Sequence, residues 1–154
     1  MADVPHIMIV EARFYEDIAD ALVSSAIAEL EAAEASYERF QVPGAFEIPA
    51  AIRYAIRSMD FYAGRRRFDG YIALGCVIRG ETTHYDYVCQ ESARALQDLA
   101  TRYTLAIGYG ILTVENRAQA MARAKRSDKD RGGHAARACL KMIDLKRHFG
   151  LFPR

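Results

Sequence analysis

A turn rich in hydroxyl groups and free backbone amides precedes a single histidine in the segment Val77–His84, which reads VIRGETTH. The turn at residues 80–83 leads into a predicted helix, where N–H groups, the helix dipole and threonine hydroxyls can together hold a phosphate. The spacing of Thr83 and Asp86 also resembles a capping box, which needs no ligand at all. Phosphate binding and simple helix capping therefore both remain open from composition alone.

His84 is the one group in this segment that could transfer protons near neutral pH. It lies at or just inside the predicted helix N-terminus, where the positive end of the helix dipole disfavours an imidazolium. A neutral ring can accept a proton, as a general base must. A histidine in a first helical turn is more often a surface or capping residue, so a structural role for His84 remains open beside the catalytic one.

Three further residues have a chemical and a structural interpretation. Glu47 lies among apolar residues and turn formers in the segment Pro43–Pro49 (PGAFEIP), where it could accept hydrogen bonds from ligand hydroxyls or serve as a first-turn acid. Phe14 could stack on a planar ring or belong to the core. Tyr109, at the end of a predicted strand, has the same two interpretations.

Two groups of cations could contact an anion. Arg123, Lys129 and Arg131 surround a charged connector between two predicted helices, and could form an anion-binding edge that serves a neighbouring subunit. Three consecutive arginines, 65–67, lie in the loop-like segment Phe61–Phe68. The ordinary interpretation of both groups is a solvated charged surface.

The elements that must position these residues alternate between strand-like and helix-like patterns. Apolar runs and alternation predict four strands, and residues at helical spacing predict helices between and after them. The predicted strands are His6–Val10, Ser36–Val42, Gly70–Val77 and Leu105–Leu112. The predicted helices cover about residues 16–33, 49–59, 84–99, 115–125 and 134–143.

Strands that alternate with helices predict a parallel sheet covered by helices on both faces and joined by right-handed crossovers. Sites in such folds lie beyond the carboxyl ends of the strands. That rule selects the loops at residues 11–15, 43–47, 76–84 and 109–115. These loops contain most of the candidate residues.

Composition restricts the class of protein. A chain of 154 residues predicts one domain over residues 1–154, and a net charge of +1 argues against a dedicated nucleic-acid surface. There is no apolar run of ~18 residues and no signal-peptide pattern. The three cysteines are odd in number and far apart, which favours reduced thiols in the cytoplasm. The common nucleotide, hydrolase and zinc motifs are absent, so a nicotinamide-dependent enzyme, an ATPase, a serine hydrolase or a zinc enzyme has no support.

Four collinear strings together resemble the 6,7-dimethyl-8-ribityllumazine synthase family over about residues 6–149. They are VPGAFEIP (Val42–Pro49), LGCVIRGETTHYDYV (Leu74–Val88), GYGILTVEN (Gly108–Asn116) and DKDRGG (Asp128–Gly133). The resemblance implies a flavodoxin-like, three-layer αβα sandwich with a four-stranded parallel sheet and about five helices. It implies condensation of 5-amino-6-(D-ribitylamino)uracil with 3,4-dihydroxy-2-butanone 4-phosphate, without a cofactor, and release of inorganic phosphate. It also implies a homo-oligomer built on pentamers, with the active site between subunits.

The resemblance also implies roles for individual positions. Phe14 would stack on the pyrimidine, and the backbone of Val77 and Ile78 would contact its edge. The segment Ala45, Phe46 and Glu47 would hold the ribityl chain. The positions near the phosphate or the reacting atoms are Gly80, Glu81, Thr82 and Thr83, in the phosphate turn, and His84, for proton transfer. Two positions would come from the neighbouring subunit: Arg123, which would bind the phosphate, and the aromatic residue Tyr109. Arg131 would lie near the pyrimidine carbonyls.

The sequence departs from the family pattern at several of these positions. Arg131 stands where many members have lysine, Tyr109 where many have phenylalanine, and Cys76 where threonine is common. Arginine keeps the charge but is a planar fork rather than a compact ammonium. A flavin or lumazine carrier, or a shell protein that has lost turnover, is therefore the alternative function. A flavodoxin-like signalling domain is a third and weaker alternative.

Overall fold

The computed structural model describes residues 4–62 and 67–151. Arg65 and Arg66 of the arginine triplet lie outside these residues, whereas Arg67 forms an ion pair with Glu38. In chain order the elements are β1 (His6–Ala12), α1 (Glu16–Ala32), β2 (Ser36–Val42), the 3-10 helix η1 (Ala45–Glu47), α2 (Ile48–Ser58), β3 (Gly70–Ile78), α3 (His84–Tyr103), β4 (Ile107–Val114), α4 (Arg117–Ala124) and α5 (Arg131–His148).

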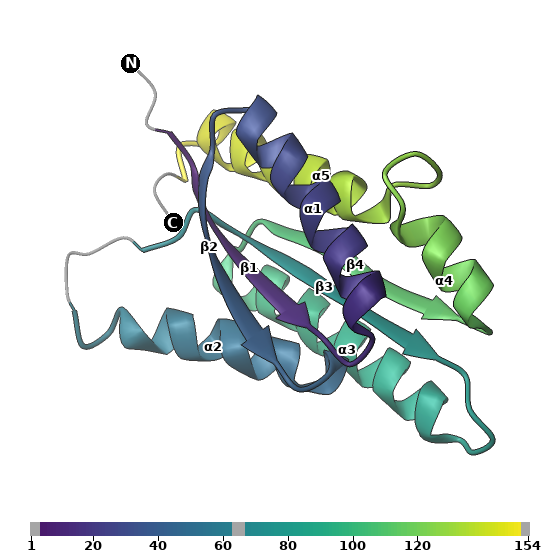
Figure 1. The fold of residues 1–154 in the computed structure, drawn as a ribbon. Helices are drawn as coiled ribbons and strands as arrows, with labels where there is room; N and C mark the ends of the chain where they lie inside the picture. The colour runs from purple at the N-terminus through teal and green to yellow at the C-terminus, as the bar shows by residue number, and fades with distance from the viewer. Residues whose placement is uncertain (1–3, 63–66, 152–154) are drawn as a thin grey trace.

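The four strands form one parallel sheet in the order β2-β1-β3-β4. Helices α1, α4 and α5 cover one face, and α2 and α3 cover the other, as Figure 1 shows. Each face has its own apolar core, since successive side chains of a strand point to opposite faces. The flavodoxin-like three-layer αβα architecture that the sequence predicts is confirmed.

Two strands extend further than their apolar patterns predict. The predicted first strand ends at Val10, before a charged glutamate. In the structure, β1 continues through Glu11 to Ala12, and Ala12 pairs with Val42 on β2. Glu11 is fully buried within this strand, which is possible because arginines bind its carboxylate. The last predicted strand likewise continues to Val114, where it pairs with Ile78.

Within the described ranges, no helix is long and apolar enough to cross a membrane.

Gly108 permits α5 to lie directly against β4. A Cβ atom at this position would overlap the carbonyl oxygen of Ala135 and lie 3.2 Å from Cys139 Cβ, so the backbone of one element must shift. We expect Gly108→Ala to destabilise the fold by about 1–3 kcal/mol, and thus to lower Tm by about 2–12 °C. Calorimetry at fixed protein concentration measures this. Gly80→Ala, whose Cβ would meet nothing within 4 Å, is the matched control, and equal Tm losses for the two variants would contradict this packing.

Candidate active site

A pocket of about 570 Å³ lies at the carboxyl ends of β1, β2 and β3. Figure 1 shows that these strand ends lie at one edge of the sheet, next to the start of α3. The pocket therefore occupies the position that the parallel topology predicts. Its lining residues are Phe14, Tyr15, Pro43, Gly44, Ala45, Phe46, Glu47, Cys76, Val77, Ile78, His84, Tyr87 and Val88.

Phe14 belongs to the surface of this pocket and not to the core. Its side chain is 74% exposed, and it contacts the ring of Tyr15 edge-on with the ring centroids 4.9 Å apart. An exposed phenylalanine gains little from burial in the free protein. The structural interpretation of Phe14 as a core residue is therefore wrong, and its ring face is available to a planar ligand.

Glu47 lies at the end of η1, directly before α2. It occupies the N-cap position of α2 in a helical conformation, and its side chain makes no capping hydrogen bond there. Pro49 follows in the first turn of α2, as the sequence predicts. Since Glu47 is exposed and lines the pocket, its carboxylate can accept hydrogen bonds from ligand hydroxyls.

His84 is the first residue of α3, and its side chain lines the pocket. The predicted capping box is wrong, because Thr83 makes no side-chain capping hydrogen bond. A capping residue needs an extended backbone, whereas Thr83 is helical, with φ −76° and ψ −2°. The backbone N–H of His84 instead donates to Thr82 Oγ1 over 3.3 Å.

Arg79, which the sequence analysis missed, anchors the loop that precedes His84. Its Nε donates to Glu115 Oε2 over 2.7 Å, and its guanidinium lies 4.3 Å from the ring centroid of Tyr85. The backbone N–H of Arg79 also donates to the carbonyl of Val114 over 2.9 Å. These contacts tie the turn at residues 80–83 to the end of β4. Only its place directly after a predicted strand could have drawn attention to Arg79.

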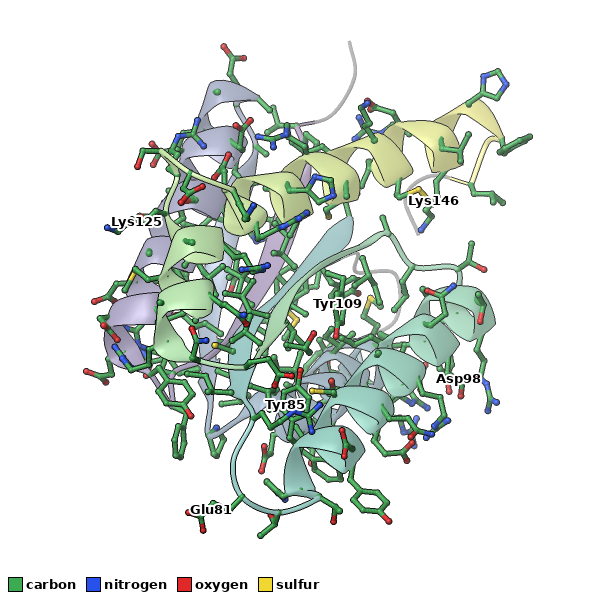
Figure 2. The ribbon with its side chains drawn as sticks, turned by 90° about the vertical axis from the view of Figure 1, so that its right-hand side faces the viewer. Glu81, Tyr85, Asp98, Tyr109, Lys125 and Lys146 are labelled. Carbon is green, nitrogen blue, oxygen red and sulfur yellow. The ribbon has the colours of Figure 1, made fainter. Side chains whose placement is uncertain are left out.

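The turn residues Gly80, Glu81, Thr82 and Thr83 are exposed and do not line the pocket within this chain. Figure 2 shows Glu81 on the loop before α3, pointing away from the body of the protein. The turn is therefore open to solvent on the side away from the sheet.

Besides the turn at residues 80–83, three further predicted site residues do not line this pocket. Tyr109 lies on β4 facing α3, near Tyr85 (Figure 2), and burial raises the pKa of its phenol. Arg123 lies on α4, across the sheet from α3, and donates to the carbonyl of Gln119 over 3.0 Å. Arg131 is exposed at the start of α5. One chain thus brings together His84 and the predicted site residues of the loops after β1, β2 and β3, but neither the turn at residues 80–83 nor these three.

Cys76 adds a thiol to the pocket wall. Burial raises its pKa to about 11, so the thiol is neutral at pH 7 and is neither a nucleophile nor a strong hydrogen-bond acceptor. Tyr15, Tyr87 and Val88 also line the pocket. Helical spacing could have found the last two, because Tyr87 and Val88 lie three and four residues after His84.

The pocket combines aromatic rings, one carboxylate and one imidazole. It can enclose a planar heterocycle, bind a polyhydroxyl chain and transfer a proton. Across residues 4–62 and 67–151, no group of three or more His, Cys, Asp or Glu side chains is arranged to hold a metal ion.

Comparisons with known proteins agree with these features. A family model described as 6,7-dimethyl-8-ribityllumazine synthase matches residues 5–147. The chain is similar to the 6,7-dimethyl-8-ribityllumazine synthase of Bartonella tribocorum, with 58% identity over 146 residues, 95% of this chain and 93% of that protein. It is also 58% identical over 146 residues to the synthase of Agrobacterium fabrum, covering 95% of this chain and 97% of that protein. Its identity to 6,7-dimethyl-8-ribityllumazine synthase 1 of Rhizobium meliloti is 58% over 145 residues, 94% of both chains.

Proposed function

The chain belongs to the 6,7-dimethyl-8-ribityllumazine synthase family, and we propose that it carries out the reaction of that family in a site shared by neighbouring subunits. The protein is a transferase. It condenses 5-amino-6-(D-ribitylamino)uracil with 3,4-dihydroxy-2-butanone 4-phosphate and yields 6,7-dimethyl-8-ribityllumazine, phosphate and water, the penultimate step of riboflavin biosynthesis. The comparisons give no support to the alternative of a catalytically weak binding or shell-forming protein.

The pocket of one subunit holds the pyrimidine. Phe14 stacks on the ring, and the backbone of Val77 and Ile78 contacts its polar edge. The ribityl chain runs along Ala45 and Phe46, and the Glu47 carboxylate accepts hydrogen bonds from its hydroxyls. Supporting this arrangement, all six residues line one pocket, and the side chain of Glu47 is not used as a helix cap.

The butanone phosphate is held beside the pyrimidine. Backbone amides and hydroxyls of Gly80, Glu81, Thr82 and Thr83 contact its phosphate. The pyrimidine amine attacks the ketone and yields an imine with loss of water, phosphate is then eliminated, and the ribitylamino nitrogen attacks the remaining carbonyl and closes the ring with loss of a second water. His84 transfers protons during imine formation and phosphate elimination. Orientation of two small substrates in this way can supply ~7–11 kcal/mol toward the barrier.

The neighbouring subunit completes the site. Its Arg123 binds the substrate phosphate, its Tyr109 contributes an aromatic wall, and its Arg131 approaches the pyrimidine carbonyls. The observation that carries this proposal is that Arg123 does not line the pocket that contains His84, although the reaction must bind a phosphate dianion there.

A closed ring is the assembly that gives every subunit one such neighbour. We propose a homopentamer or a multiple of pentamers, each chain forming one domain over residues 1–154. We place the protein in the cytoplasm, with small molecules as its other partners. Three free cysteines and no disulfide among the described residues fit a reducing compartment.

Mixing two impaired variants tests the shared site. Separately purified Arg123→Ala and His84→Ala subunits are dissociated together, reassembled and assayed by lumazine absorbance at a butanone phosphate concentration well below the KM of Arg123→Ala, where both variants turn over slowly. In random rings, about a quarter of the interfaces pair an intact His84 with an intact neighbouring Arg123. We therefore expect activity to return to about a quarter of the wild-type value.

The same dissociation and reassembly of each variant alone is the control, and it should restore nothing. If the mixture stays as slow as the separate variants while reassembled wild-type protein is active, both residues serve the same subunit and the shared site is wrong.

A further inference from the structure

A buried cluster of charges lies beside the pocket at the carboxyl end of β1. The side chain of Glu11 points to the face covered by α1, as that of Ile9 does two residues earlier, and it is fully buried. The guanidinium of Arg39, on β2, donates two hydrogen bonds to this carboxylate. Its Nε donates to Oε2 over 2.7 Å, and a terminal nitrogen donates to Oε1 over 2.8 Å. Arg13 donates a further hydrogen bond to Oε1 over 2.8 Å.

The cluster keeps the carboxylate ionised. Burial raises the pKa of Glu11, but the hydrogen bonds from Arg39 and Arg13 outweigh burial, and the pKa lies below its usual value. Two cations therefore converge on a buried anion, Arg13 from a largely buried position and Arg39 from a side chain that is partly exposed. Buried ion pairs of this kind contribute little net stability compared with apolar residues of the same shape, so stability alone is a weak reason for the cluster.

Arg13 connects this buried anion to α1. Its side chain is only 15% exposed, and its other terminal nitrogen donates to the carboxylate of Asp20 on α1. The guanidinium thus spans the short loop between β1 and α1. These hydrogen bonds to β1 and to α1 restrain the Arg13 side chain and the short loop that carries it.

The residue on the other side of Phe14 is also anchored. The Tyr15 ring packs against the α1-side core, and the guanidinium of Arg117 lies 5.8 Å from its centroid. Arg117 in turn donates a hydrogen bond to the carboxylate of Asp17. Phe14 is therefore an exposed ring between two neighbours whose side chains are fixed.

We propose that Arg13 is a positioning residue. Anchored on the buried carboxylate of Glu11, it holds the Phe14 ring over the pocket before substrate binds. This inference rests on the proposed role of Phe14 in stacking on the pyrimidine. An exposed aromatic ring has few contacts of its own to fix it, so the backbone on either side sets its position. A loop that is ordered in the free protein loses less conformational entropy when the ligand binds.

Substitution of Arg13 by glutamine tests this role in steady-state kinetics. Arg13→Gln leaves Glu11 paired with Arg39, so we expect the protein to fold. The KM for the ribitylaminouracil should rise about two- to tenfold, the range that one aromatic contact spans. The kcat and the KM for butanone phosphate should stay within about twofold of wild type. Asp20→Asn, which removes only the negative charge of the outer partner of Arg13, should give a smaller change in the same direction.

A fluorescent reporter tests the same inference without turnover. The chain contains no tryptophan, so Phe14→Trp places a single indole over the pocket. In the absence of substrate, time-resolved fluorescence anisotropy should show that the local motion of the indole is restricted. Introducing Arg13→Gln into the Phe14→Trp protein should increase this motion. Val23→Ala, in the core-facing side of α1, is the control that lowers stability without touching the charge cluster. It should leave the anisotropy and the KM for the pyrimidine unchanged.

The variant Phe14→Ala distinguishes failure of the stacking role of Phe14 from failure of the positioning role of Arg13. If Phe14→Ala leaves the KM for the pyrimidine unchanged, the proposed stacking role of Phe14 is wrong, and this inference fails with it. If Phe14→Ala raises that KM while Arg13→Gln changes neither the KM nor the indole motion, the stacking role stands and the positioning role of Arg13 is overturned. An equal effect of Val23→Ala would also overturn it, because general destabilisation would then explain the result.

Discussion

His84→Ala is expected to lower kcat by about 10²–10⁴-fold without abolishing turnover. The imidazole lies at the start of α3 and lines the pocket, so it can reach a substrate there. Proton transfer is only one part of the catalysis, because Phe14, Glu47 and the neighbour's Arg123 would still orient both substrates. The measurement is the initial rate of lumazine formation at saturating substrates, corrected for the uncatalysed reaction.

Two controls separate proton transfer from structure. His148→Ala removes an exposed histidine at the end of α5, and it should leave kcat unchanged. Added imidazole should restore part of the rate of His84→Ala, and it should not affect the wild type. A His84→Ala protein that folds and turns over at the wild-type rate would show that another group transfers the protons.

Arg123→Ala is expected to raise the KM for butanone phosphate by about 10–100-fold. A hydrogen bond to a charged partner contributes about 1.5–3 kcal/mol, which corresponds to this range of affinity. The KM for the pyrimidine should change by less than about threefold, because the proposed site holds the phosphate and the pyrimidine with different groups. Steady-state kinetics with each substrate varied in turn gives both values.

Nearby variants test whether this effect belongs to the guanidinium. Arg123→Lys keeps the charge but loses the planar fork, so it should recover part of the affinity. Lys125→Ala removes an exposed cation two residues away and should leave both KM values unchanged. Equal losses of affinity for both substrates in Arg123→Ala would argue against a phosphate anchor and in favour of a general disturbance of the site.

The capping-box prediction shows how a local pattern can be misleading. Thr83 and Asp86 have the spacing of the motif, but the motif also requires an extended backbone at the first residue. The loop before α3 is fixed instead by Arg79, whose partner Glu115 lies 36 residues further along the chain. That distant contact coincides with a helical conformation at Thr83, which no property of the tetrapeptide itself reveals.

The sequence by itself determined the family, the parallel sheet and the loops that form the pocket. Helical and strand periodicities are local properties, and a parallel sheet brings the carboxyl ends of its strands to one edge whatever their side chains. Phe14, Glu47, Val77 and His84 could therefore be placed together before any coordinates, and the structure collects them in one pocket.

Only the tertiary structure decided which polar residues lie together. The sequence predicts Glu11 in the loop after the first strand, yet it is buried within β1 because Arg39, 28 residues away, lies beside it on the next strand. In the same way, the fold separates Tyr109, Arg123 and Arg131 from the pocket of their own chain. Such pairings depend on sheet order and register, and these are fixed when distant segments pack, because each bond joins groups that no local pattern relates.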